Sequence, residues 1–249
     1  MKNCVVKKSM FEKILEMVLP FYCRGCGKVG AILCDECWGK IELIGKVTKN
    51  KKIPSKRGKI ELGDFDALFV GGFRTGALKV LLDDYKFKSV KKIGGVLAEI
   101  IDNAIGVDLD DVVVVPLPTI RKHIRIRGFD HARRLAEELS SRHGWSVALL
   151  LKRVNKTVQV GADEETRQKQ AAQAYAVDWE KAKEEGLAVE ECGSENKSRI
   201  LCNKKYLLLD DVWTTGSSMR AAAKKLREAG AEKIYGAVVE ITSNQASGQ

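Results

Sequence analysis

Two adjacent carboxylates at the end of an apolar run are the residues of this chain best suited to chemistry. Asp210 and Asp211 directly follow Tyr206–Leu209, a short apolar run typical of a buried strand. Because open α/β sheets bind ligands at the carboxyl ends of their strands, we expect both acids at a binding edge. An ionised carboxylate only accepts hydrogen bonds, so its partner must donate them, as sugar hydroxyls or the waters of a metal ion do.

A loop of small residues follows the acids and leads into a helix expected over Ser217–Ala229. It combines hydroxyl side chains with a glycine that permits close backbone approach: Thr214, Thr215, Gly216, Ser217 and Ser218. Together with the N–H groups and the positive dipole end of a helix, this loop is suited to a phosphate. A phosphate at one end and a diol at the other describe a ribose-5-phosphate. We predict such a site over Tyr206–Ala231, as a strand, a diacidic turn, a loop and a helix.

Two simpler interpretations of this segment stay open from the residues alone. In the first, Asp210 and Asp211 merely end a strand and Ser217 is an ordinary helix N-cap. In the second, the acids form an aspartate metal site at the end of a nucleotidase-like strand. A P-loop is disfavoured, because every Gly-Lys pair in the chain is followed by Val or Ile and never by Ser or Thr.

The chain around this segment alternates between strands and helices from Asp64 onward. Val112–Val115 is a run of four valines, which is typical of a strand buried on both faces of a parallel sheet. The alternation predicts an α/β domain with a mostly parallel sheet. We expect further strands over Ala67–Phe73, Val147–Leu151 and Lys233–Ile241, helices over Phe11–Leu19, Gly76–Tyr85, Lys91–Ile105, Asp130–Ser141 and Glu164–Ala174, a polar loop over Asn155–Thr166, and a surface insertion over Trp179–Lys205.

In these features the chain resembles type I phosphoribosyltransferases and, more narrowly, the ComF family of competence-associated proteins. The apolar run, paired acids, loop and helix match the phosphoribosyl pyrophosphate motif of those enzymes. Other stretches support the resemblance: Val115–Pro118 with Arg125–Ala132 is similar to the "VPLH…R.RGFNQA" block, Arg153–Tyr175 resembles the mobile loop, and Tyr85–Phe87 stands where the family has a Lys-Tyr pair. The resemblance covers the N-terminal cysteines and nearly all of Asp64–Ile241.

The resemblance implies an open, mostly parallel, twisted sheet flanked by helices, with a small N-terminal Cys4 zinc module. It also implies a cytoplasmic phosphoribosyltransferase that binds phosphoribosyl pyrophosphate with Mg²⁺. The enzyme would transfer the phosphoribosyl group, with release of pyrophosphate, to an acceptor that the sequence does not identify. Mg²⁺ would be held mainly by oxygens of the substrate.

The resemblance assigns roles to residues at matching positions. Asp210 and Asp211 would hold the ribose hydroxyls, and Thr214–Ser218 the 5′-phosphate. The catalytic group would be Asp210, Asp211 and Arg127, the last one among the cations that stabilise the leaving pyrophosphate. The pyrophosphate would be lined by Pro118, Thr119 and Arg121, and Arg153 and Lys156 would close over the site. Departures from the family pattern are Ala162, Gln170 and His131, and all three histidines (His123, His131, His143) are expected to be structural or exposed.

Four of the seven cysteines form two close pairs near the N-terminus. Cys23 and Cys26 are separated by two residues, as are Cys34 and Cys37. This spacing is typical of a structural zinc site, with redox-active pairs as the alternative. The stretch Gly25–Gly30 is also a formal GxGxxG match, but without a preceding strand we reject dinucleotide binding there.

The charge is uneven along the chain, which carries +10 in total. Lys46–Lys59 holds seven basic residues and no acid, and is interpreted first as a solvated segment and second as a polyanion site. We therefore expect three parts: residues 1–45 with the zinc module, a basic linker over 46–63, and a phosphoribosyltransferase-like domain over 64–249. No apolar run is long enough for a membrane span, so a cytoplasmic protein is expected.

Two other functions are alternatives to catalytic transfer of the phosphoribosyl group. The chain is alternatively a DNA-uptake factor in natural transformation, in which the zinc module and the basic stretches contact single-stranded DNA or competence proteins. It is also compatible with a regulatory protein that binds phosphoribosyl pyrophosphate without using it, because a fold does not fix a function.

Overall fold

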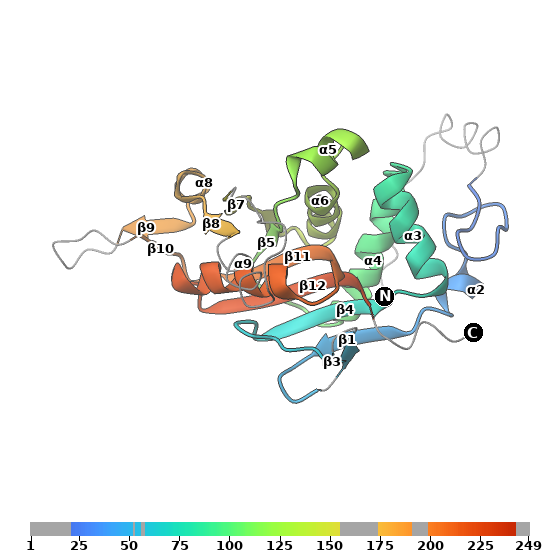
Figure 1. The fold of residues 1–249 in the computed structure, drawn as a ribbon, viewed down its shortest axis with the longest axis horizontal. Helices are drawn as coiled ribbons and strands as arrows, with labels where there is room; N and C mark the ends of the chain where they lie inside the picture. Colours follow the sequence, from blue (N-terminus) through green and yellow to red (C-terminus); the bar gives the residue numbers. More distant parts are fainter. Residues whose placement is uncertain (1–20, 52, 56–57, 155–173, 191–198, 243–249) are drawn as a thin grey trace, which may run out of the picture.

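A six-stranded sheet is the centre of the computed structural model, which describes residues 21–51, 53–55, 58–154, 174–190 and 199–242 (Figure 1). Its strand order is β1-β4-β12-β11-β5-β6, and only the edge strand β1 runs antiparallel to its neighbour. The strands are β1 (Leu43–Val47), β4 (Ala67–Phe73), β12 (Lys233–Ile241), β11 (Lys205–Trp213), β5 (Val112–Pro116) and β6 (Ser146–Val147).

Helices cover both faces of this sheet (Figure 1). One face carries α3 (Gly76–Phe87), α4 (Ile93–Ile105) and α6 (His131–His143), and the other carries α9 (Ser217–Glu228). The alternation of side chains along each strand divides the core between the two faces, since Leu207 and Leu209 pack with the first group and Tyr206 and Leu208 with α9. The predicted fold, a mostly parallel sheet flanked by helices, is confirmed.

The central strands are apolar because both of their faces are covered. All five residues of β5, including the four valines, are buried between the two helical layers. β5 pairs in parallel with β11, with Val115 opposite Leu208 and Pro116 opposite Leu209. The carboxyl ends of β5 and β11 therefore lie side by side, and this edge carries Asp210 and the loop after Pro116.

Smaller elements surround this frame. Two hairpins are β2 (Pro54–Ser55) with β3 (Gly58–Lys59) and β9 (Ala188–Glu190) with β10 (Arg199–Leu201), and a third pair is β7 (Leu151–Arg153) with β8 (Tyr175–Val177). The short helices are α2 (Asp35–Trp38), α5 (Arg121–Arg127) and α8 (Trp179–Glu184). In the described part of the chain, no helix has the length and apolar character that crossing a bilayer requires.

Two sequence-based expectations about elements are wrong, and a third is incomplete. The diacidic turn is not a turn, because β11 continues through Asp210 and Asp211 to Trp213. The strand expected over Val147–Leu151 is two short strands in different sheets, β6 and β7. The stretch Trp179–Lys205 is not merely a polar insertion, since it contains α8 and the β9–β10 hairpin and buries three apolar side chains: Ala182, Leu187 and Leu201.

The basic stretch is more structured than expected in its described residues. Val47 is fully buried at the end of β1, and Ile60 and Leu62 belong to the core. β1 crosses the boundary that we placed between residues 45 and 46, so this part of the linker is an edge of the main sheet. The helix expected over Phe11–Leu19, the loop over Asn155–Thr166 and nearly all of the helix over Glu164–Ala174 lie outside the described residues.

Candidate functional site

The two acids of β11 have different surroundings although they are adjacent. Asp211 is 4% exposed, and its Oδ2 atom lies 2.8 Å from Lys86 Nζ and 2.7 Å from His131 Nε2. Lys86 belongs to the last turn of α3 and His131 is the first residue of α6, so three elements meet at one carboxylate. Burial opposes ionisation, but the hydrogen bond from His131 and the charge of Lys86 hold the pKa of Asp211 below its usual range.

Asp210 is only partly buried and lacks such a direct cationic partner among the described residues. Its Oδ1 atom accepts a hydrogen bond from the Asp211 N–H group at 2.9 Å. Burial and the neighbouring Asp211 carboxylate raise the pKa of Asp210 to about 8, against weaker opposing effects of the Asp211 N–H hydrogen bond, Lys86 and Arg153. Asp210 is thus the acid with free capacity to accept hydrogen bonds from a ligand.

The two acids and His131 form one cluster, with a ligand atom of each lying within 4.8 Å of the others. Two carboxylates and an imidazole at this separation are suited either to a metal ion or to neighbouring hydroxyl groups. Arg127, at the end of α5, extends the cluster, because its guanidinium lies 2.8 Å from the Nδ1 atom of His131. The structure thus places Arg127 near the acids through His131.

The small-residue loop joins β11 to α9 at the same edge of the sheet. Ser217 begins α9, and its hydroxyl lies 2.9 Å from that of Thr215, whose Oγ1 atom also accepts the Ser217 N–H at 3.3 Å. Gly216 adopts a φ of +73°, and a Cβ atom there would lie 2.1 Å from the ring of Trp213. Only glycine satisfies both conditions, so the buried Trp213 ring sets the shape of the loop.

Arg220, on the first turns of α9, ties the loop to the rest of the molecule. Its guanidinium donates hydrogen bonds to the backbone oxygens of Thr215 at 3.0 Å and Glu61 at 3.1 Å, and lies 5.8 Å from the Trp213 ring centroid. Thr214 and Ser218 remain exposed on this loop. The hydroxyls and the start of α9 are thus held in place with an open side.

A pocket of about 380 Å³ lies beside the cysteines, and a larger one of about 640 Å³ lies at the carboxyl end of β5, the strand that pairs with β11. The larger pocket is lined by Pro118, Thr119 and Arg121 after β5, and by Lys152 and Arg153 of β7. Its loop is anchored to α6, because the Thr119 hydroxyl donates to the carboxylate of Asp130 at 2.9 Å, and Asp130 also caps α6. The structure thus brings these predicted residues together at one cavity.

Arg153 connects this pocket to the small-residue loop. Its guanidinium lies 5.2 Å from the Tyr175 ring centroid and donates to the Tyr175 hydroxyl at 3.2 Å. Burial raises the pKa of Tyr175, while the charge of Arg153 and a hydrogen bond with Ser218 oppose this rise. The β7–β8 pair therefore flanks both the pocket and the start of α9. Lys156, also predicted to close over the site, lies outside the described residues.

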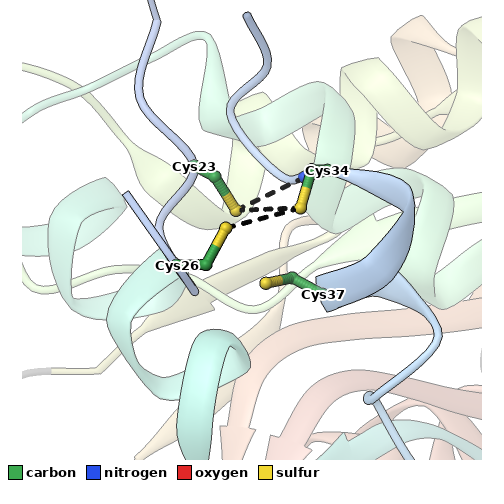
Figure 2. Close-up of side chains that lie close together, drawn as sticks. All are labelled: Cys23, Cys26, Cys34 and Cys37. Carbon is green, nitrogen blue, oxygen red and sulfur yellow. Dashed lines mark hydrogen bonds between the residues drawn. The ribbon is translucent and has the colours of Figure 1, made fainter. Parts of the chain in front are cut away.

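The four N-terminal cysteines gather at a second place, shown in Figure 2. Their sulfur atoms all lie within 4.8 Å of one another, and the Sγ atom of Cys34 lies 3.6 Å from those of Cys23 and Cys26. Sulfurs on a tetrahedral zinc ion, with Zn–S bonds of about 2.3 Å, are separated by about 3.8 Å. A disulfide needs about 2.05 Å, so the arrangement fits a metal and not a covalent pair.

Backbone groups favour the thiolate form of Cys23, one of the four cysteines. The N–H groups of Gly25 and Cys34 donate to Cys23 Sγ, each at 3.4 Å. Burial opposes ionisation, but these hydrogen bonds lower the pKa of the Cys23 thiol to about 6. Gly25 must be small, because a Cβ atom there would lie 2.5 Å from Cys37 Sγ. The residues present therefore fit a zinc ion.

Two side chains of the acidic cluster were not predicted as parts of it from the sequence. Lys86 was noted only as part of the Tyr85–Phe87 match. His131, expected to be structural or exposed, is buried against Asp211, a contact that was not predicted. Lys86 lies 125 positions and His131 lies 80 positions before Asp211 in the chain. The only signal in the sequence was the position of both residues inside blocks that resemble the family.

Comparisons with known proteins identify the family of the domain that carries this site. A family model for the phosphoribosyl transferase domain matches residues 84–245, which is more than half of the chain. No curated protein matches the chain. Similar solved structures include the allosteric regulatory enzyme of purine biosynthesis, with 16% identity and a TM-score of 0.35, and the glutamine phosphoribosylpyrophosphate amidotransferase from B. subtilis in complex with ADP and GMP, with 19% identity and a TM-score of 0.34. Each match covers 59% of this chain and 24% or 25% of the other, so the chain spans about a quarter of their length.

Proposed function

This chain belongs to the phosphoribosyl transferase domain family, and we propose that it binds phosphoribosyl pyrophosphate with Mg²⁺ and transfers the phosphoribosyl group with release of pyrophosphate. The observation that supports this most is the shared edge of the sheet. Paired acids and a hydroxyl-rich helix start stand at the carboxyl end of β11, and a pocket with cations lies at the carboxyl end of the neighbouring β5. These groups match a diol, a phosphate and a pyrophosphate, which are the three parts of this ligand.

Each part of the ligand has its own group of residues in this proposal. Asp210 accepts hydrogen bonds from the ribose hydroxyls, and Asp211 holds the cluster together through Lys86 and His131. Thr214–Ser218 binds the 5′-phosphate at the start of α9. The pyrophosphate lies along Pro118, Thr119 and Arg121, and Mg²⁺ neutralises charge on its oxygens when bound.

The reaction is a displacement at the anomeric carbon of the ribose. The bond from this carbon to the pyrophosphate oxygen breaks, the electron pair leaves with pyrophosphate, and a nucleophilic acceptor forms the new bond. The chain contributes position and charge, because the acids and the loop fix the ribose while Arg121, Arg127 and Arg153 favour the leaving anion. Arg127 acts from the His131 side and Arg153 from the β7 side.

Calorimetry with phosphoribosyl pyrophosphate and Mg²⁺ tests this proposal. We expect the wild-type chain to bind the complete ligand more tightly than ribose-5-phosphate or pyrophosphate alone, because each of these occupies only part of the site. Asp110→Asn alters an exposed carboxylate at the amino end of β5 and should bind like the wild type. It is the matched control for Asp210→Asn, which alters a carboxylate of the site. Equal affinity for all three ligands would show that the site does not recognise phosphoribosyl pyrophosphate.

Pyrophosphate release in the presence of candidate acceptors separates a transferase from a sensor. Release that depends on an acceptor supports turnover, and tight binding without release under any condition supports a regulatory protein. The role in DNA uptake, with single-stranded DNA and competence proteins as partners, stays a prediction.

We also propose that the cysteine cluster holds a structural zinc ion, as in the ComF family that the chain resembles. A module of this size has few apolar contacts of its own and gains stability from its metal. Elemental analysis of the purified chain should find about one zinc per molecule, and Cys37→Ser should lower this content. Lys28→Met, at an exposed ion pair of the same module, should leave it unchanged. A metal-free wild-type chain that keeps its full thermal stability would contradict the structural role.

A further inference from the structure

The last turn of α3 carries four consecutive side chains that each contact a different part of the molecule. The pairs are Asp83 with Arg74, Asp84 with Arg24, Tyr85 with His131, and Lys86 with Asp211. Through them, α3 contacts the end of β4, the cysteine module, α6 and β11 in turn. This turn therefore joins the N-terminal module to the acidic cluster.

The contact with the cysteine module is made by a buried carboxylate. Asp84 is 5% exposed, and its Oδ2 atom lies 2.7 Å from Arg24 Nε. Arg24 stands between Cys23 and Cys26, and its Nη1 atom also donates to the Tyr22 backbone oxygen at 2.7 Å. Because water is largely excluded from Asp84, its attraction to Arg24 is screened less than that of an exposed pair, although Arg24 Nε does not make a hydrogen bond of normal geometry.

The neighbouring contact with the acids depends on the same turn of helix. Residues two apart in an α-helix project about 200° from each other, so Asp84 and Lys86 point in nearly opposite directions. Lys86 Nζ lies 2.8 Å from Asp211 Oδ2. A shift or rotation of this turn would therefore change the distance between Lys86 and Asp211.

We propose that Arg24 is a positioning residue for the ribose site, because it fixes the last turn of α3 and thereby holds Lys86 against Asp211. The inference rests on the proposed function of the acidic cluster. A zinc ion on Cys23 and Cys26 would fix the backbone on both sides of Arg24. The cysteine module then contributes to ligand affinity without touching the ligand.

The chain offers a variant that tests this link without leaving a buried charge unpaired. Lys88 Nζ lies 2.8 Å from Asp84 Oδ1, so Asp84 keeps one cation when Arg24→Met removes the other. The matched control is Lys28→Met, which removes a cation of the same module that pairs with the exposed Glu36. Arg24→Lys keeps the positive charge and should therefore retain part of the ligand affinity that Arg24→Met loses.

Calorimetry on the full zinc-loaded chain measures the dissociation constant of phosphoribosyl pyrophosphate with Mg²⁺. We expect Arg24→Met to weaken binding roughly fivefold or more, with zinc content unchanged. Asp84→Asn should weaken binding similarly, and the double variant should be no weaker than the worse single variant, since both remove the same contact. Arg24→Met that binds like the wild type, or losses that add up in the double variant, would overturn the proposal.

A second measurement is independent of the ligand. Amide hydrogen exchange in the last turn of α3 should be faster in Arg24→Met than in the wild type, and unchanged in Lys28→Met. Absence of ligand binding by the wild type would refute the proposed function alone, and the exchange result would then still decide whether Arg24 fixes α3. Equal exchange in Arg24→Met and the wild type would refute the link itself.

Discussion

Replacing Asp211 with asparagine is expected to lower the free energy of unfolding by about 3–5 kcal/mol, the usual cost of removing one partner of a buried ion pair. Asp211 is 4% exposed and Lys86 and His131 both contact its Oδ2 atom. The neutral amide leaves the Lys86 ammonium group without its partner in a site where little water is available to replace it. Denaturation with urea at pH 7 measures the loss.

A second variant separates this charge effect from a packing effect. Lys86→Met with Asp211→Asn removes both charges, so the double variant should recover most of the lost stability.

The wild type should also lose stability on acidification below about pH 4, the ordinary pKa range of an aspartate in an unfolded chain. The pKa of Asp211 in the folded chain is held below that range. The ionised Asp211 therefore contributes its full stabilisation above about pH 4, and this contribution is lost as the pH falls further. A stable Asp211→Asn variant would contradict the ion-pair account.

Replacing Asp210 with asparagine is expected to have the opposite effect on stability and to weaken ligand binding. Burial and Asp211 raise the pKa of Asp210 to about 8, so folding disfavours the ionised form of this group. The cost to stability grows as the pH rises from about 4, the pKa of an aspartate in the unfolded chain, to about 8, the pKa of Asp210 in the folded chain. The variant lacks this cost and should be more stable by roughly 1–2 kcal/mol at pH 8, and not at pH 4.

Ligand binding by Asp210→Asn should be about tenfold weaker or worse, because only the carboxylate has acceptor capacity left for two ribose hydroxyls. One oxygen of Asp210 already accepts the Asp211 N–H group. For the same reason, the wild type should bind more tightly as the pH rises from 6 toward 8. Thermal unfolding and calorimetry across this pH range measure both effects. A variant that binds normally, or is less stable than the wild type at pH 8, would remove Asp210 from the ribose site.

Local sequence patterns were sufficient for most elements of the frame. The four valines of β5, the strands β4 and β12 and the helix α9 were predicted within a residue or so at each end, because burial and periodicity act over a few neighbouring residues. Errors came where local pattern and tertiary pairing compete. β11 continues through its two acids because β12 provides partners as far as Ile241, opposite Trp213.

The chemistry of the site was predictable only in part. The adjacency of Asp210 and Asp211, the hydroxyl residues of the loop and the spacing of the cysteines are all visible in the sequence. Gly216 was expected to permit close backbone approach. The group that requires a glycine there is the Trp213 ring, and its position depends on tertiary packing. The sequence thus determined which groups are available and roughly where they stand along the chain.

The tertiary structure decided what each of the two acids is able to do. Two adjacent aspartates look equivalent in the sequence, yet one is paired with Lys86 and His131 in the interior and the other is only partly buried and has a raised pKa. The reason is physical: a pKa and an ion pair depend on burial and on charges within a few ångströms. Packing of α3 and α6 against β11 supplies those charges from positions far away in the chain, which no local pattern encodes.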